Sequence, residues 1–336
     1  MNRTFLYLII FLVLGGATFW MLTKSSEDEK TSLLGADRKF KVEQPEEIQK
    51  IFIADRKGNT TTLERQGDHW VYNEKYRARP NVMENLLDAI TRVEIKYQPP
   101  RQAVEHMISS LATEGIKVEI FNKKGEIIKS YYVGGSTADE RGTFMMMADA
   151  EQPYVANIPN WSGNIRFRYN LKGDDWRDVM VFDEQMENIS KVEVEYPKQR
   201  NKSFVVSREG NEFDVAPYFD ITPKKNLPVP QGKVEQFLVN FEKVGSRGFD
   251  NKNPEKDSIA ATIPFCRISL ENNNGDRTDL EMYPIQRDLQ FDEKTGEPLP
   301  SGEVENYYAV LNDEDFLVVS HLVMKKLLWA YEFFYQ

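Results

Sequence analysis

The histidines and the single cysteine are the residues of this sequence best suited to metal or nucleophilic chemistry. The histidines lie far apart, and none has a second His or Cys at the spacing of metal ligands: His69, His106 and His321. Cys266 is alone, which excludes an internal disulfide, and it lies in an apolar run where a thiol usually behaves as a small core side chain. We therefore expect no zinc site and a structural role for Cys266.

Loops that bind phosphates or present a nucleophile have short sequence signatures. The chain has no Gly-x-Ser-x-Gly elbow, no phosphate-binding loop and no dinucleotide fingerprint. The nearest stretch is Gly134-Gly135-Ser136-Thr137, but it has no lysine and no helix follows it, so we expect a hairpin connection there. The sequence therefore predicts no catalytic residues and no cofactor.

Two clusters of acidic residues are dense enough to suggest a divalent cation held by oxygen ligands. They are Asp174, Asp175 and Asp178, and Asp313, Glu314 and Asp315. Neither has the ligand spacing and central glycine of a calcium loop, so solvated turns or charges at helix starts are the preferred interpretation, and no metal is expected. Within the first cluster, we expect Arg177 either to pair with an acid across a domain junction or to pack there beside Trp176.

Aromatic residues are the remaining indication of a binding surface. With 15 Tyr, 20 Phe and 5 Trp, the chain has enough rings for a glycan or peptide groove as well as for a core. Asn160-Trp161-Ser162 and Tyr218-Phe219 fall in predicted loops, where rings are open to solvent. Residue types alone do not define a groove, so a small ligand stays an open alternative.

The composition indicates folded domains and argues against one class of partner. At 336 residues with 40% hydrophobic content, the chain is long enough for two domains with buried cores. Its 53 acidic and 43 basic residues disfavour nucleic acid as a partner, because a phosphate backbone requires a basic surface.

An uncharged apolar segment near the N-terminus predicts a membrane anchor. No residue from Phe5 to Leu22 is charged, and a helix of this length covers about 27 Å at ~1.5 Å per residue, close to the thickness of a bilayer core. A cleaved signal peptide is the alternative, but its apolar region normally has only ~7–15 residues. Arg3 and the N-terminal amine precede the span, which favours a cytoplasmic N-terminus. We expect an anchor over residues 1–23, a polar tether over 24–40 and a body outside the cytoplasm.

Beyond the tether, the hydrophobic pattern predicts several strands and one helix. Pro80 is well placed to begin the helix, whose apolar residues recur at three- and four-residue steps: Val82, Met83, Leu86, Leu87, Ile90 and Val93. The expected strands around it cover residues 48–53, 60–65, 70–72, 116–121, 127–133, 143–147 and 154–158.

The same order of elements returns about 140 to 150 residues later. Leu63, Arg65, Gly67 and Trp70 align without a gap on Val206, Arg208, Gly210 and Phe213, and Val118, Ile120 and Gly125 on Ile268, Leu270 and Gly275. Apolar positions and turn glycines repeat while surface residues differ, which is typical of a duplicated fold. We therefore expect an α+β protein with two tandem related domains, residues 41–181 and 182–336, each an antiparallel sheet packed with one main helix.

Several of these segments carry a resemblance. They are Ile48 to Trp70, Tyr132-Val133-Gly134-Gly135 leading into Gly142-Thr143-Phe144, Pro153-Tyr154-Val155, and Trp176-Arg177-Asp178 followed by Val181-Phe182-Asp183. Together they resemble a family of bacterial membrane-anchored envelope proteins, catalogued as a domain of unknown function and found beside gliding-motility-type ABC transporter auxiliary components. The second half departs from the pattern, because no Gly-Gly pair lies near Tyr283-Pro284 and a long insert covers Gln286 to Glu305. The resemblance implies the bacterial inner membrane, a periplasmic body and an association with transport or motility machinery.

The C-terminal stretch from His321 to Gln336 predicts a helix with two apolar rows. One row should pack on the second domain: Met324, Leu327, Leu328, Tyr331 and Tyr335. Leu322, Trp329 and Phe333 form the other row beside charged residues, a composition typical of a partner-binding patch. The alternative is that another part of the same molecule covers this second row.

Taken together, these patterns predict a non-enzymatic, single-pass membrane-anchored scaffold outside the cytoplasm, which contacts other envelope proteins. The alternative function is a small-solute or glycan-binding auxiliary protein of an ABC-type transporter. An interdomain cleft lined by aromatic and converging polar groups would favour the second function, and a filled apolar contact would favour the first.

The membrane span gives the first testable prediction. The protein should stay in the membrane fraction after alkaline or high-salt washing, since these treatments remove electrostatic contacts but not a spanning helix. A reporter fused after Gln336 should be active only outside the cytoplasm. Recovery of a soluble mature form that begins near Ser25 would contradict the anchor and indicate a cleaved signal.

Overall fold

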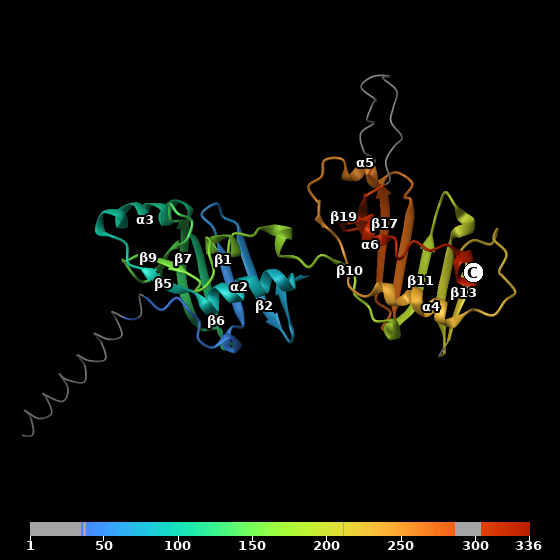
Figure 1. The fold of residues 1–336 in the computed structure, drawn as a ribbon, viewed down its shortest axis with the longest axis horizontal. Coiled ribbons are helices and arrows are strands. Elements are labelled where there is room, and N and C mark those ends of the chain that lie inside the picture. The colour runs from blue at the N-terminus through green and yellow to red at the C-terminus, as the bar shows by residue number, and fades with distance from the viewer. Residues whose placement is uncertain (1–34, 36–37, 211, 286–303) are drawn as a thin grey trace, which may run out of the picture. The chain divides into compact units, whose positions relative to one another are not determined.

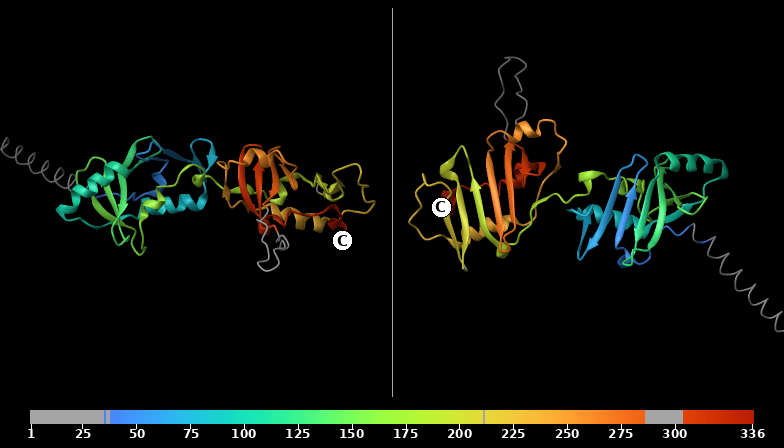
Figure 2. Two further views of the ribbon diagram at one scale, coloured as in Figure 1. Left: turned by 90° about the horizontal axis from the view of Figure 1, so that it is seen from above. Right: turned by 180° about the vertical axis from the view of Figure 1, so that it is seen from behind.

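The computed structural model describes residue 35 and residues 38–210, 212–285 and 304–336. The chain divides into two compact units, with the boundary between Asp178 and Val179. Each unit contains an antiparallel sheet with few helices, as the ribbon in Figure 1 and the two further views in Figure 2 show. The α+β class with antiparallel sheets, expected from the sequence, is therefore confirmed.

Within the described residues, the sheet of the first unit has nine strands in the order β4-β3-β2-β1-β6-β7-β8-β9-β5. Their bounds are β1 (Lys50–Ala54), β2 (Thr60–Gln66), β3 (His69–Tyr72), β4 (Tyr76–Arg77), β5 (Glu94–Tyr97), β6 (Ile116–Phe121), β7 (Ile127–Ser136), β8 (Thr143–Met147) and β9 (Tyr154–Asn157). The strands expected from hydrophobic alternation are all present, whereas β4 and β5 were not expected.

The core of the first unit lies between this sheet and helix α2 (Pro80–Arg92). In the central strand, Ile51 pairs with Leu63 of β2 on one side and with Ile120 of β6 on the other, and all three side chains are fully buried. Helix α2 begins with Pro80 at its first position and buries Met83, Leu86, Ala89 and Ile90. The expected helix and its apolar stripe are thus confirmed.

A second long helix, α3 (Arg101–Glu114), also packs on the first sheet. Val133 of β7 belongs to the core beside α2, so its neighbour Gly134 faces the other side of the sheet. There, a Cβ atom on Gly134 would lie 2.8 Å from Leu111 Cδ2 of α3, closer than real contacts allow. The prediction of a hairpin connection at Gly134-Gly135 is therefore wrong, because both glycines lie inside β7. The prediction of one main helix per sheet is also wrong for this unit.

In the described part of the second unit, the main sheet has eight strands in the order β13-β12-β11-β16-β17-β18-β19-β15. Their bounds are β11 (Ile189–Glu195), β12 (Phe204–Glu209), β13 (Glu212–Pro217), β15 (Gly248–Phe249), β16 (Cys266–Asn272), β17 (Arg277–Pro284), β18 (Asn306–Leu311) and β19 (Asp315–Ser320). Helix α4 (Gln231–Leu238) packs on the sheet through the buried residues Val234, Phe237 and Leu238. Two short strands, β10 (Met180–Phe182) and β14 (Val244–Gly245), pair with each other as a separate two-stranded sheet. Helix α5 (Lys256–Ala260) precedes β16.

The prediction of a continuous C-terminal helix is wrong. The segment forms only a short helix, α6 (His321–Met324), and a 3-10 turn, η7 (Tyr331–Tyr335), with an irregular stretch between them. Met324, Leu327 and Tyr331 are nevertheless buried in the core of the second unit. Leu328 and Tyr335 are only partly buried against this core, whereas Phe334, which the apolar spacing did not include, is fully buried. Ring packing therefore contributes to holding the chain after Leu328. Phe334 contacts the ring of Phe204 at 4.9 Å between centroids.

The two sheets have corresponding strand orders once the edge strand β4 is set aside. The central residue Val192 of β11 pairs with Val206 and Leu270, as Ile51 does with Leu63 and Ile120. Arg65 also pairs with Trp70, and Arg208 with Phe213. The residues that align in sequence therefore occupy matching positions in the two sheets.

The anchor predicted over Phe5 to Leu22 lies outside the described residues, as does most of the insert from Gln286 to Glu305. Among the residues that are described, no helix is both long enough and apolar enough to cross a membrane.

The matching positions of Trp70 and Phe213 give the second prediction. Both side chains are buried, with exposed fractions of 8% and 7%. Substituting either by Ala should lower the free energy of unfolding by about 3–5 kcal/mol, because each truncation leaves a cavity. Urea unfolding of Trp70→Ala and Phe213→Ala measures this loss. Phe333→Ala is the control, since the Phe333 side chain is 44% exposed. If Trp70→Ala and Phe213→Ala lose no more free energy of unfolding than the control, the two residues do not hold matching core positions.

Candidate functional site

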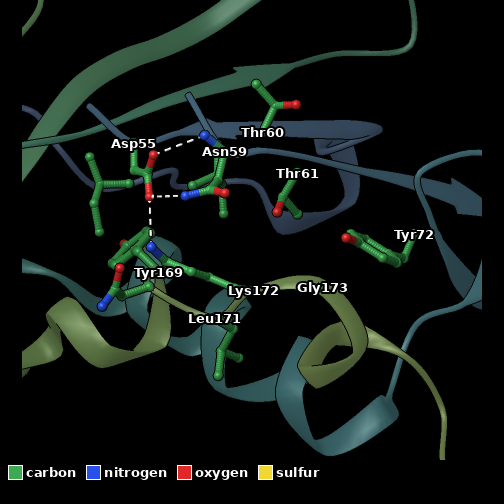
Figure 3. Close-up of a pocket in the computed structure, with 12 residues that line it drawn as sticks. Asp55, Asn59, Thr60, Thr61, Tyr72, Tyr169, Leu171, Lys172 and Gly173 are labelled. Atoms are coloured by element: carbon green, nitrogen blue, oxygen red, sulfur yellow. Dashed lines mark hydrogen bonds and ion pairs between the residues drawn. The ribbon is translucent and has the colours of Figure 1, made fainter. Parts of the chain in front are cut away.

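A small pocket lies in the first unit, where the ends of β1 and β2 meet the segment from Tyr169 to Gly173. Its volume is about 210 Å³, and part of its wall is apolar, formed by Ile53, Ile116 and Leu171. Polar side chains form the rest of the wall: Asp55, Asn59, Thr60, Thr61, Tyr72, Tyr169, Asn170 and Lys172. We call this space the hydroxyl-lined pocket, and Figure 3 shows how its side chains surround it.

One side of the pocket is fixed by the tight turn that joins β1 to β2. Asp55 accepts hydrogen bonds at its Oδ1 from the backbone N–H groups of Lys57 and Asn59, both at 2.9 Å. Gly58 has φ of +86°, a conformation that favours glycine. The other carboxylate oxygen, Oδ2, accepts hydrogen bonds from Asn59 Nδ2 at 2.7 Å and from Lys172 Nζ at 2.8 Å (Figure 3). Asp55 therefore ties the segment that contains Lys172 to the end of the sheet.

The charge of Asp55 is stabilised by these contacts. Burial alone would raise the pKa of the Asp55 carboxyl, but the hydrogen bonds from Lys172, Asn59 and the Lys57 backbone outweigh it. The pKa of Asp55 therefore lies well below its usual value. Asp55 stays ionised at neutral pH, and it has a cation beside it.

The hydroxyl groups of Thr61 and Tyr72 also face the pocket, but unlike Asp55 they have no hydrogen-bond partners in the described part of the chain. Thr61 and Tyr72 are only 6% and 7% exposed, and neither hydroxyl has a hydrogen-bond partner among the residues that the structure describes. In Figure 3 both hydroxyl groups point toward the space beside Lys172 and Gly173. Burial, together with the charge of Asp174, raises the pKa of Tyr72 above its ordinary value, so this hydroxyl stays protonated and can donate.

An apolar groove lies elsewhere on the first unit, between strands β3 and β4 and helix α2. It has a volume of about 520 Å³, and its apolar lining consists of Pro45, Trp70, Ala78, Pro80, Met83 and Leu87. Its polar lining has three carboxylates and one arginine beside a histidine and a threonine: Asp68, Glu84, Asp88, Arg77, His69 and Thr91. Trp70, Ala78 and Met83 are buried, whereas the side chains of Asp68 and Arg77 are 97% and 53% exposed. We call this feature the α2 groove, with an apolar floor and a charged rim.

The three residues predicted as a partner-binding row have different environments. Leu322 is 70% exposed and lines a hollow of about 620 Å³ with Arg247, His321 and Lys325. Phe333 is 44% exposed. Trp329 instead packs on the core, with its ring 5.4 Å from that of Phe237 and 5.3 Å from that of Phe334. Without a continuous helix, the three residues do not share one helical face.

The first acidic cluster holds arginines, and in the second cluster Asp315 accepts a hydrogen bond from Asn251 Nδ2 at 3.1 Å. Asp174 pairs with Arg177 at 3.1 Å, and Asp178 pairs with Arg77 at 3.6 Å. Among the described residues, no group of three or more acids, histidines or cysteines is arranged to hold a metal ion. Arg177 also lies 3.7 Å above the ring of Tyr76, another residue of the first unit.

The other candidate residues lie in ordinary structural positions. Trp176 is fully buried in the first core, and its indole N–H donates to the Leu171 carbonyl at 3.0 Å. Cys266 is fully buried in the second core, where burial raises the pKa of its thiol. Trp161 packs on the Arg168 guanidinium at 4.8 Å, and the Tyr218 ring contacts the Phe219 ring at 4.9 Å.

The sequence patterns did not identify the pocket residues. Their signal was weak but present: Thr61 is a polar residue at an inward position of β2, beside the apolar Leu63. The residue that pairs at the same position of the second sheet is Phe204, opposite Val194, as Thr61 is opposite Ile53. A polar residue in one half and an aromatic residue in the other was the sequence difference that marked the pocket.

Comparison with protein-family models, with curated proteins and with solved structures found no match to the chain. The resemblance to the envelope-protein family therefore stays a prediction.

The third prediction concerns the contact between Asp55 and Lys172. Asp55→Asn keeps an oxygen for the turn but removes the charge, so it should lower the free energy of unfolding at neutral pH by about 0.2–1 kcal/mol. Because the folded pKa of Asp55 is depressed, its contribution is fully present above the ordinary value of 3.8 and is lost as the pH falls through the folded value. Urea unfolding of the wild type and Asp55→Asn across this pH range checks the prediction. A difference in their free energies of unfolding that stays constant down to about pH 2 would contradict it.

Proposed function

We propose that the protein is a non-enzymatic, single-pass membrane-anchored scaffold whose body lies in the periplasm and contacts other envelope proteins. The proposed anchor is the uncharged segment from Phe5 to Leu22. The two units are proposed to be tandem repeats of one fold, supported by their corresponding strand orders. In this view, duplication supplied a second sheet, and the surfaces of the two units then diverged.

The observation that carries this proposal is the α2 groove. A buried apolar floor with an exposed charged rim is the usual organisation of a protein interface. Trp70 and Met83 lie at the floor, and Leu87 is half-buried at the wall. Asp88 already pairs with Arg92 and Arg168, so the preference of the rim is set by Asp68 and Glu84, whose carboxylates favour a partner segment with an apolar side chain next to a basic one.

A second candidate function is the binding of a small solute for a transporter. The hydroxyl-lined pocket favours it, because the hydroxyl groups of Thr61 and Tyr72 face the pocket and have no hydrogen-bond partners among the described residues. Both functions agree with an accessory role beside envelope transport or motility machinery, which is what the family resemblance implies.

The fourth prediction tests the groove. Leu87→Lys places a positive charge in the groove, where it should repel a basic partner segment and prevent copurification from detergent-solubilised membranes. The free energy of unfolding should change by less than about 1 kcal/mol, because Leu87 is half-buried on a helix. Mass spectrometry of the copurified proteins and urea unfolding measure the two effects.

Ile127→Lys is the matched control. Ile127 is an apolar residue of the same unit, is 53% exposed and does not line the groove. The proposal requires that a partner captured with the wild-type protein is retained by the control and lost by Leu87→Lys. Equal retention by both variants would show that the α2 groove is not the contact.

A further inference from the structure

We infer that the hydroxyl-lined pocket of the first unit binds one uncharged sugar ring. The inference goes beyond the proposed protein contact and uses different residues, because the α2 groove and this pocket share no lining side chain. It depends on three observations: two unsatisfied hydroxyl groups, a neutralised pair of charges and a hollow that the fold itself does not require.

The hydroxyl groups define the polar chemistry of the ligand. Thr61 and Tyr72 are more than nine-tenths buried and aim at one space, with no hydrogen-bond partner among the described residues (Figure 3). The two residues are buried, but their hydroxyl oxygens stay accessible from the pocket, so a ligand in the pocket can pair with them. Each hydroxyl can both donate and accept a hydrogen bond, so the best complement is another set of hydroxyl groups. An apolar ligand would leave both groups unpaired.

The charges beside the pocket argue against an ionic ligand. Asp55 and Lys172 lie 2.8 Å apart and neutralise each other. The carboxylate of Asp55 already accepts four hydrogen bonds, from two backbone N–H groups, Asn59 and Lys172. An anionic ligand would have to compete with Asp55 for Lys172, and a cation would have to displace Lys172 from Asp55. A neutral ligand disturbs neither contact.

The shape and the apolar wall limit the size of the ligand. The volume of about 210 Å³ lies below the ~300–1,000 Å³ typical of pockets for drug-sized ligands. Ile53, Ile116 and Leu171 give an apolar wall beside the ring of Tyr72. A pyranose ring combines a face of C–H groups with an edge of hydroxyl groups, so it matches the apolar wall and the polar groups together.

The second unit shows that this hollow is not a necessity of the fold. Phe204 occupies the position of Thr61 in the strand register, and Val215 that of Tyr72. Both are fully buried, and the ring of Phe334 packs on Phe204 at 4.9 Å. The same place is thus filled with apolar side chains in one unit and open and lined with hydroxyl groups in the other. A polar hollow that the fold can fill indicates a ligand site.

The experiment measures binding of neutral monosaccharides to the full-length chain, kept in a detergent without a sugar headgroup. The probes are the methyl glycosides of glucose, mannose and galactose, N-acetylglucosamine, and glucuronate as a charged counterpart. Saturation-transfer NMR detects binding, and titration calorimetry gives the dissociation constant. At least one neutral ring should bind at millimolar concentration or below, and more tightly than glucuronate.

The variants Thr61→Val and Tyr72→Phe each remove one hydroxyl group while keeping the shape of the side chain. Each should weaken binding by about two- to tenfold, the usual effect of losing one hydrogen bond, and the double variant should weaken it further. Thr62→Val is the matched control, since Thr62 is the next residue of β2 and faces the other side of the sheet. The control should bind like the wild type.

Thermal unfolding without ligand separates a lost contact from a lost fold. Both variants should melt close to the wild-type temperature, because each removes a hydroxyl group that faces the pocket and holds no other described side chain. If Thr61→Val does not fold, Tyr72→Phe alone decides. The inference is overturned if no neutral sugar binds at millimolar concentration, if the double variant binds as tightly as the wild type, or if glucuronate binds more tightly than every neutral probe. None of these outcomes bears on the contact at the α2 groove.

Discussion

Each sheet is organised around the register of one central strand. In β1, Ile51 lies between Leu63 of β2 and Ile120 of β6, and Val192 of β11 is placed in the same way between Val206 and Leu270. A slip of one residue would turn all these side chains toward the opposite face of the sheet and bring Lys50 or Lys191 into the core. The positions of the helices, the pocket and the groove all follow from this register, because each is built on the inward residues or the ends of these strands.

The sequence predicts an element well where its buried residues recur at regular spacing, and poorly where they do not. Helix α2 has four buried residues at helical spacing, so its pattern is unambiguous. Helix α3 buries only Met107 and Leu111, and the feature that explains its position is Gly134, a residue without a side chain on a distant strand. The C-terminal segment was predicted wrongly as one continuous helix, because its sequence carries a helical signal that the structure does not follow. Its apolar residues have helical spacing, but the segment forms only two short helical pieces, and the rings of Phe237 and Phe334 pack together in the core that it covers.

The candidate site was harder to predict than the fold. The pocket residues are ordinary in type, and their importance depends on where the chain places them: Thr61 on a strand, Lys172 on a distant segment that the carboxylate of Asp55 holds. The three residues predicted as a partner row, Leu322, Trp329 and Phe333, were grouped by assuming a continuous helix, and that helix does not form. The alignment of the two halves contains the signal for the pocket. It matches Thr61 of the first sheet with Phe204 of the second, at a strand position whose side chain points inward in both sheets.

The strand order also has a consequence for how the chain folds. Strand β1 can pair with β2 through a short turn, but its other partner, β6, comes after two helices have been made, and the edge strand β5 must wait for β9. Pairings between distant segments are slow, because the entropy of closing a long loop is lost before the contacts form. During synthesis, one edge of the β1–β2 hairpin therefore stays open, and such an edge is prone to pairing with another chain. This edge of β1 is exposed for as long as synthesis has passed α2 but has not reached β6.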